Sequence, residues 1–139
     1  MPETPESILG LDVGERLVGV AFASLAAGIA RPYITLTRND KFFDSLQKII
    51  DSENVNTLIV GLPRGLDGQS TAQTASVEDF VKRLRQRFNL TIVFQDEAVT
   101  SKQAEAELKS RGKVYQRSDI DSLAATYILE DYLTSIRRI

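Results

Sequence analysis

The sequence predicts an α/β fold in which helices cover the faces of a mixed sheet, and three observations support this. Short apolar runs open the chain with a turn between them, which is typical of antiparallel strands. Later apolar runs alternate with stretches of helical periodicity, as in parallel βαβ units. The 139 residues, 42% of them hydrophobic, fit a single domain over residues 1–139. Hairpins followed by strand–helix alternation indicate a mixed sheet.

Five strands are predicted, and the first three are consecutive. The expected ranges in chain order are 7–13, 16–24, 30–37, 57–60 and 90–95. Gly14 and Glu15 form a hairpin turn between the first two strands. Pro32 indicates that the third strand begins there or lies at an edge of the sheet, because proline cannot donate to a ladder.

Four helices are predicted, and each begins at a polar residue that can cap it, in chain order Asp40, Ser70, Thr100 and Ser118. In the last three helices, a polar residue three positions later gives capping-box spacing, namely Gln73, Gln103 and Asp121. The second helix is expected to end near Phe88 and the third at Gly112.

The composition excludes several classes of chemistry. The chain has no Cys and no His, which excludes disulfides, zinc fingers, thiol nucleophiles and a Ser-His-Asp triad. The net charge of −2 excludes a uniformly basic nucleic-acid coat. Catalysis would therefore depend on carboxylates, Lys, Arg, Tyr, Ser or Thr. A metal site built only from carboxylates selects hard cations, here Mg²⁺ or Mn²⁺.

The longest uncharged stretch, 17–30, predicts no membrane segment. It is shorter than the roughly 20 residues that cross a bilayer. The residues before it are acidic, whereas a secretory signal begins with positive charge. We therefore expect a cytoplasmic protein without a membrane partner.

Acidic residues in three segments are candidates for function, and each segment has a structural alternative. Asp12 lies between Gly10 and Gly14 on one strand face, where bare positions admit an ion or phosphate; alternatively, Asp12 bonds a turn amide. Asp96 and Glu97 follow a strand, where ligands gather in α/β sheets, or they favour the positive end of the next helix.

Asp121 either borders the apolar stripe of the last helix or completes its capping box. If acids from these three segments converge, they would hold divalent cations. Two such ions can activate a water and stabilise the leaving oxygen of a phosphodiester. The sequence alone leaves this convergence open.

Several segments together resemble the YqgF/RuvX family of ribonuclease H-like nucleases. They occur in family order from about residue 8 to residue 133, and they are Leu9-Gly10-Leu11-Asp12-Val13-Gly14, Gly19-Val20-Ala21, Ala30-Arg31-Pro32, Ile59-Val60-Gly61-Leu62-Pro63, Leu66-Asp67-Gly68, Asp96-Glu97, Thr100-Ser101, Ala104-Glu105, Ile120-Asp121-Ser122, Ala124-Ala125 and Ile128-Leu129. Each segment is weak alone, but jointly they are specific.

The resemblance implies a ribonuclease H-like fold, a five-stranded mixed sheet whose first three strands are antiparallel, with helices on both faces. It implies a catalytic, metal-binding site at Asp12, Glu97 and Asp121. It also implies an endonuclease that trims the 5′ end of precursor 16S rRNA, with resolution of Holliday junctions in branched DNA as the alternative.

Two positions depart from the family pattern. The family usually has Arg after the Asp-Glu pair, and this chain has Ala98. The loop after Pro63 usually carries Asn where this chain has Gly65, next to Arg64. A lost guanidinium removes a bidentate phosphate contact, which puts substrate affinity or activity in question.

The expected contacts to nucleic acid are basic residues near the acidic positions: Arg16, Arg64, Lys102, Arg111 and Lys113. The alternative for the basic residues after Glu97 is a solvated helix face. For a second basic group, 82–87, we favour that solvated face.

Two other functions stay open. One is a non-catalytic nucleic-acid-binding module, and the other is an actin-like ATPase, although an ATPase of that kind needs two such domains. The sequence does not distinguish a monomer from a homodimer.

Overall fold

The computed structural model describes residues 6–63, 69–97, 100–112 and 116–137. These residues form a five-stranded sheet in the order β3-β2-β1-β4-β5. The strands are β1 (Ser7–Val13), β2 (Leu17–Ser24), β3 (Ala30–Thr37), β4 (Val55–Pro63) and β5 (Thr91–Glu97). β1 pairs antiparallel with β2, and β2 pairs antiparallel with β3. β4 runs parallel to both β1 and β5, so the sheet is mixed as predicted.

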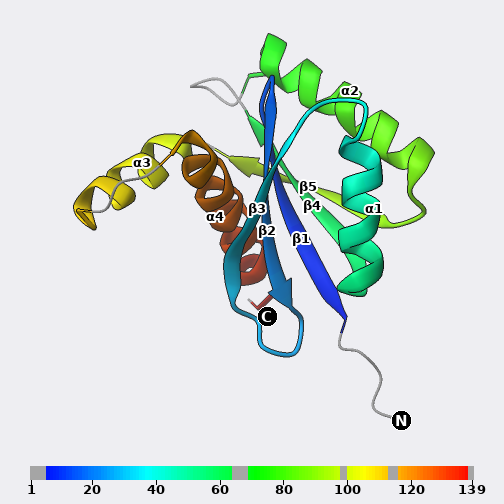
Figure 1. Cartoon of the computed structure of the whole chain (residues 1–139), viewed down its shortest axis with the longest axis horizontal. Coiled ribbons are helices and arrows are strands. Elements are labelled where there is room, and N and C mark those ends of the chain that lie inside the picture. The colour runs from blue at the N-terminus through cyan, green and yellow to red at the C-terminus, as the bar shows by residue number, and fades with distance from the viewer. Residues whose placement is uncertain (1–5, 64–68, 98–99, 113–115, 138–139) are drawn as a thin grey trace.

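Helices cover both faces of the sheet (Figure 1). They are α1 (Phe42–Ser52), α2 (Ala72–Arg87), α3 (Thr100–Ser110) and α4 (Arg117–Arg137). α1 and α2 lie on one face, and α4 lies on the other. α3 packs on α4 and projects away from the sheet (Figure 1). The fold class predicted from the sequence is confirmed.

Strand alternation divides the core into two parts. On β1, Leu9 and Leu11 are fully buried in the cluster beneath α1 and α2. Ile8, on the opposite face, packs with Ala125 and Leu129 of α4. The α4 face therefore carries smaller side chains next to β1 and β2, and the helix lies close to these strands.

The predicted strand bounds agree best with the structure at the start of the chain. β1 and β3 have the predicted bounds, and Pro32 lies on an edge strand as expected. β2 begins one residue later than predicted. β4 and β5 continue further, since their parallel ladder extends to the Pro63–Glu97 pair. Asp96 and Glu97 thus end a strand instead of following it.

The predicted helix caps are mostly wrong. α1 starts after Lys41 without a side-chain cap, so Asp40 does not cap it. The capping box of α2 joins Thr71 to Thr74, one residue later than Ser70 and Gln73. The register is set by the buried Thr74, whose hydroxyl also donates to the carbonyl oxygen of Pro63 at 2.5 Å.

The predicted cap of the third helix is not tested, and the fourth helix begins differently from the prediction. Thr100 is the first residue of α3, and its side chain lies outside the described part. At α4, Oδ2 of Asp119 accepts from the backbone N–H of Gln116 at 2.9 Å. Asp119 therefore has the capping role predicted for Asp121.

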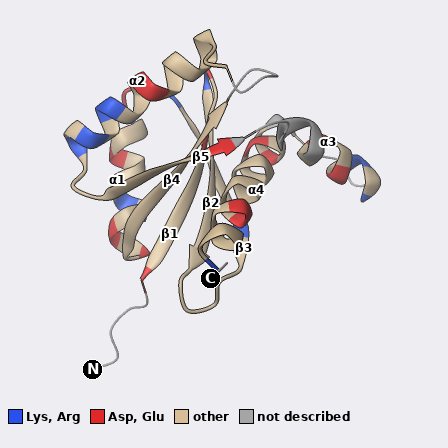
Figure 2. Cartoon of the chain, turned by 180° about the vertical axis from the view of Figure 1, so that it is seen from behind, with Lys and Arg blue, Asp and Glu red and all other residues tan. Residues whose placement is uncertain are grey.

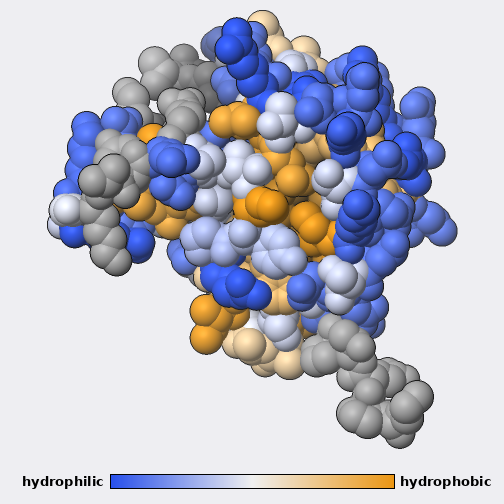
Figure 3. Space-filling model, viewed as in Figure 1, coloured by the Kyte–Doolittle hydropathy of each residue, from blue (hydrophilic) through white to orange (hydrophobic). Residues whose placement is uncertain are grey.

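Within the described residues, no helix combines the length and hydrophobicity needed to cross a bilayer. Hydrophobic side chains do reach the surface between α1 and α4, and hydrophilic residues surround them (Figure 3). Ile34 on the edge strand β3 is one exposed hydrophobic residue.

Candidate functional site

A row of aligned residues crosses the first three strands beneath the start of α4. Asp12 of β1 pairs with Gly19 of β2, which pairs with Thr35 of β3. Directly opposed residues point to the same face of a sheet. The Thr35 hydroxyl donates to the carbonyl oxygen of Ser118 at 2.6 Å. This bond fixes the first turn of α4 on the row that contains Asp12.

Gly19 brings the backbone of α4 against the sheet. A Cβ atom at Gly19 would overlap the carbonyl oxygen of Asp121. Two residues before Asp12, a Cβ atom at Gly10 would meet the carbonyl oxygen of Ala125 at 2.9 Å. The helix positions 121 and 125 therefore run alongside the strand positions 12 and 10, so Asp12 and Asp121 lie next to each other across the interface between β1, β2 and α4.

The environment of Asp121 differs from that of a helix cap. Its side chain is 8% exposed, and its Oδ2 atom is fully buried. Burial of a carboxylate is costly unless charge or hydrogen bonds compensate for it. Since Asp119 already supplies the cap, the capping alternative for Asp121 does not hold. A buried acid beside Asp12 is a candidate for cation binding.

β5 delivers the third predicted acid to the same end of the sheet. β1, β4 and β5 run parallel, so their carboxyl ends share one edge. α4 contacts β5 as well as β1 and β2, and Figure 2 shows the acidic end of β5 beside the start of α4. Strand alternation places position 97 on the same face of the sheet as Val93, which packs on the α4 side. The side chain of Glu97 lies outside the described part.

The described side chains contain no group of three acids that could hold a metal ion. The three-acid site is therefore not tested, because Glu97 is one of its members. The available pair does suit a hard cation: two neighbouring carboxylates offer only oxygen ligands. A small cavity beside Asp121 gives an ion a route to this acid.

A cavity of about 250 Å³ joins Asp121 to the turn between β1 and β2. Arg16 and Glu15 of that turn line it. Arg16, predicted to contact nucleic acid, thus shares a cavity with a predicted catalytic acid. A guanidinium beside an acidic site is suited to hold a phosphate group.

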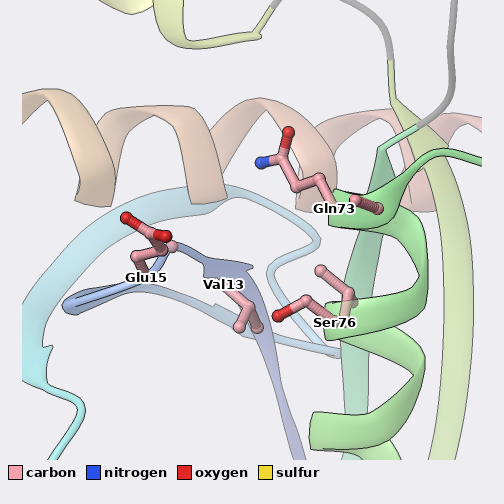
Figure 4. A pocket seen from close by; sticks show the side chains of 7 residues that line it. Val13, Glu15, Gln73 and Ser76 are labelled. Carbon is pink, nitrogen blue, oxygen red and sulfur yellow. The ribbon is translucent and has the colours of Figure 1, made fainter.

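A second cavity, of about 520 Å³, lies between the same turn and the first turns of α2. Figure 4 shows Val13 and Glu15 on one side of it, with Gln73 and Ser76 on the other. The sequence predicts a capping role for Gln73 and marks no role for Ser76. No local signal marks these residues, because the cavity depends on where α2 meets the turn.

Of the other predicted nucleic-acid contacts, Arg111 is the one whose side chain lies in the described part of the chain. Arg111 pairs with Glu107 at 2.6 Å, and Glu107 also accepts a hydrogen bond from the Tyr127 hydroxyl. Arg111 therefore helps to attach α3 to α4. Arg64 and Lys113 lie outside the described residues, as does the side chain of Lys102.

Solved structures of similar fold define the class. The Thermus thermophilus RuvC in complex with a Holliday junction substrate has a TM-score of 0.56 and 14% identity, covering 95% of this chain and 96% of that one. The fowlpox virus resolvase in complex with Holliday junction DNA has a TM-score of 0.54 and 12% identity, covering 94% and 98%. The fold is thus ribonuclease H-like.

The chain belongs to the RuvX family, described as Holliday junction resolvases, whose model matches residues 6–135. A relative from Thermoanaerobacter pseudethanolicus named "Putative pre-16S rRNA nuclease" is 36% identical, covering 92% of this chain and 96% of the relative. A relative of the same name from Methylobacillus flagellatus is 37% identical, covering 98% and 99%. These matches confirm the family resemblance.

Proposed function

We propose that this protein is a metal-dependent endonuclease that trims the 5′ end of precursor 16S rRNA in the cytoplasm. The observation that carries the proposal is the juxtaposition of Asp12 and Asp121 across Gly19. Family membership and the names of the relatives support the reaction class and the RNA substrate.

The acids and Arg16 have separate roles in the proposed reaction. Asp12, Glu97 and Asp121 would hold Mg²⁺ or Mn²⁺, which when bound neutralises charge on the phosphodiester and lowers the pKa of the attacking water. The rigid strand and the packed helix hold Asp12 and Asp121 in place before the substrate arrives. Arg16 binds a phosphate in the cavity that it shares with Asp121 and aligns the nucleic-acid strand.

Branched DNA is the second candidate substrate. The specific observation in its favour is the shared fold with two resolvases that were solved with Holliday junctions. A non-catalytic role follows instead if Ala98, in place of the family's Arg, has removed activity.

The test incubates the purified chain with labelled precursor-rRNA fragments and with four-way DNA junctions, in Mg²⁺, in Mn²⁺ and in EDTA. We expect RNA cleavage that EDTA abolishes. Asp12→Asn and Asp121→Asn should each reduce the cleavage rate by at least about 100-fold, because metal stabilisation of a phosphoryl transition state contributes several kcal/mol.

Matched controls come from the neighbouring acids. Asp119→Asn removes a charge from the same turn of α4, and Asp96→Asn does so beside Glu97; both side chains are exposed. These variants should cleave at rates close to wild type. Normal cleavage by a folded Asp12→Asn variant would contradict the site, and binding without cleavage in any metal would favour the non-catalytic role.

A further inference from the structure

A third cavity, of about 440 Å³, opens on the α1 and α2 side of the β1–β2 turn. Its size is typical of small-ligand sites. Glu15 lines it and also lines the cavity that contains Asp121 and Arg16. The cavity is therefore adjacent to the candidate site, but it shares none of the proposed metal-binding acids.

Aromatic side chains form the inner wall of this cavity. Phe43 and Phe80 stack with a centroid separation of 6.2 Å and an interplanar angle of 19°. Phe42 meets Phe80 edge to face at 5.3 Å. Phe42 and Phe80 are buried, whereas Phe43 is partly exposed. Phe43 thus offers a supported aromatic surface to a flat ligand.

Arg38 connects this wall to the candidate site. Its guanidinium lies 4.9 Å from the centroid of Phe80 and donates from Nη1 to the carbonyl oxygen of Gly14 at 3.0 Å. The planar group is held in place and gives a second surface for stacking. Gly14 also lines the cavity of Asp121, so a ligand here would lie beside the turn that carries Arg16.

Positively and negatively charged side chains complete the rim of the cavity. Because their charges balance, the cavity favours a base over a simple anion. Arg38 and Arg83 are balanced by Glu15 and Asp40. Asn39 adds an amide whose Oδ1 accepts from the backbone N–H of Lys41 at 3.0 Å, which orients its NH₂ group to donate to an acceptor on the edge of a base. Arg83 is 66% exposed and only loosely paired with Asp79 at 3.7 Å, so it can turn to a phosphate.

We propose that this cavity is a base-binding subsite, which holds one unstacked base of a single-stranded segment while its neighbour occupies the acidic site. The proposal rests on the proposed function, since it deepens the account of how the substrate binds. It assigns stacking on the base to Phe43, recognition of the base edge to Asn39 and a phosphate contact to Arg83.

Binding without cleavage tests this subsite separately from catalysis. The full chain in EDTA is titrated with fluorescent single-stranded RNA and DNA oligonucleotides, each carrying one abasic position in turn. We expect a single window in which an abasic position weakens binding roughly 5- to 150-fold, the range for loss of one stacked base. The RNA and DNA series identify which sugar the subsite accepts.

Variants test whether the base at the sensitive oligonucleotide position binds in this cavity. Phe43→Leu and Asn39→Ala should each remove the abasic effect, and Arg83→Ala should lower affinity at every position and reduce the salt slope by about one. Arg87→Ala is the control, because Arg87 lies one turn further along α2, pairs with Asp44 and does not line the cavity. It should keep the abasic effect.

Three outcomes would overturn the subsite: equal affinity for every abasic oligonucleotide, an abasic effect that survives both Phe43→Leu and Asn39→Ala, or no binding at all. The first two leave the proposed nuclease intact if the cleavage assay is positive. The third, together with no cleavage, removes both proposals. Urea unfolding of each variant verifies that the fold is retained.

Discussion

At the scale of single residues, two acids in one helical turn have different roles. Asp119 is exposed and accepts the hydrogen bond that starts α4. Asp121 is buried against the sheet beside Asp12. The sequence predicts a capping role for Asp121, because it follows Ser118 at capping-box spacing. Only the contact of Gly19 with α4 distinguishes them, and that contact joins segments that are distant along the chain.

Arg16 gives a prediction at the same scale. Its guanidinium shares a cavity with Asp121, and the side chain is exposed. Arg16→Ala should weaken RNA binding and reduce the slope of log affinity against log salt by about one, because one phosphate contact is lost. Fluorescence titration at several salt concentrations measures this slope.

The control for Arg16→Ala is Lys48→Ala, which removes the same charge from an exposed position on α1. It should leave the salt slope unchanged, since Lys48 lines neither cavity beside the candidate site. Equal slopes for wild type and Arg16→Ala would exclude a direct phosphate contact by Arg16.

At the scale of elements, the close approach of α4 to β1 and β2 positions the candidate site. Ala125 is fully buried against the sheet, and Gly10 and Gly19 beneath the helix leave its backbone room. Ala124 is also fully buried, but it packs toward α3. Large side chains at these positions would separate Asp12 from Asp121.

Gly19→Ala tests that packing. The new Cβ would overlap a backbone carbonyl, which cannot rotate away as a side chain can. We expect a loss of about 1–3 kcal/mol in the free energy of unfolding, as for other overpacked sites. Urea unfolding measures it, and cleavage should fall even where the variant is fully folded.

Gly10→Ala provides the comparison for Gly19→Ala. Its added Cβ would meet Ala125 and Leu129 at 2.9 and 3.0 Å, so the conflict is milder. The variant should lose less stability than Gly19→Ala. If the order is reversed, or if Gly19→Ala is as stable as wild type, α4 does not rest on β2 at this point.

At the scale of the whole molecule, the predictable features are those set by local pattern. The apolar run of β1 marks its bounds because α1 and α2 cover one face of this strand and α4 covers the other. The sequence predicts Ser70 as the cap of α2, but Thr71 is an equally good cap, and the hydrogen bond from Thr74 to Pro63 selects Thr71. The cavities beside Asp121 follow from tertiary packing, which no short segment encodes.

The surroundings of Glu130 on α4 also make stability depend on pH. Partial burial raises the pKa of Glu130 above its ordinary value, and the negative charges of Glu107 and Asp131 raise this pKa further. The folded state therefore favours the protonated acid. The resulting stabilisation is complete below the unfolded pKa of about 4.3, and it is lost as the pH rises through the folded value.

Glu130→Gln should remove this dependence, because glutamine does not ionise. The variant should be more stable than wild type at pH 7. The difference should shrink as the pH falls through the raised folded pKa of Glu130 and should vanish below about 4.3. Urea unfolding at pH 3.5, 5 and 7 measures the effect. Glu78→Gln, at an exposed position on α2, is the control for the change in charge. A Glu130→Gln difference that grows as the pH falls would contradict the argument, because it would mean that the ionised carboxylate stabilises the folded state.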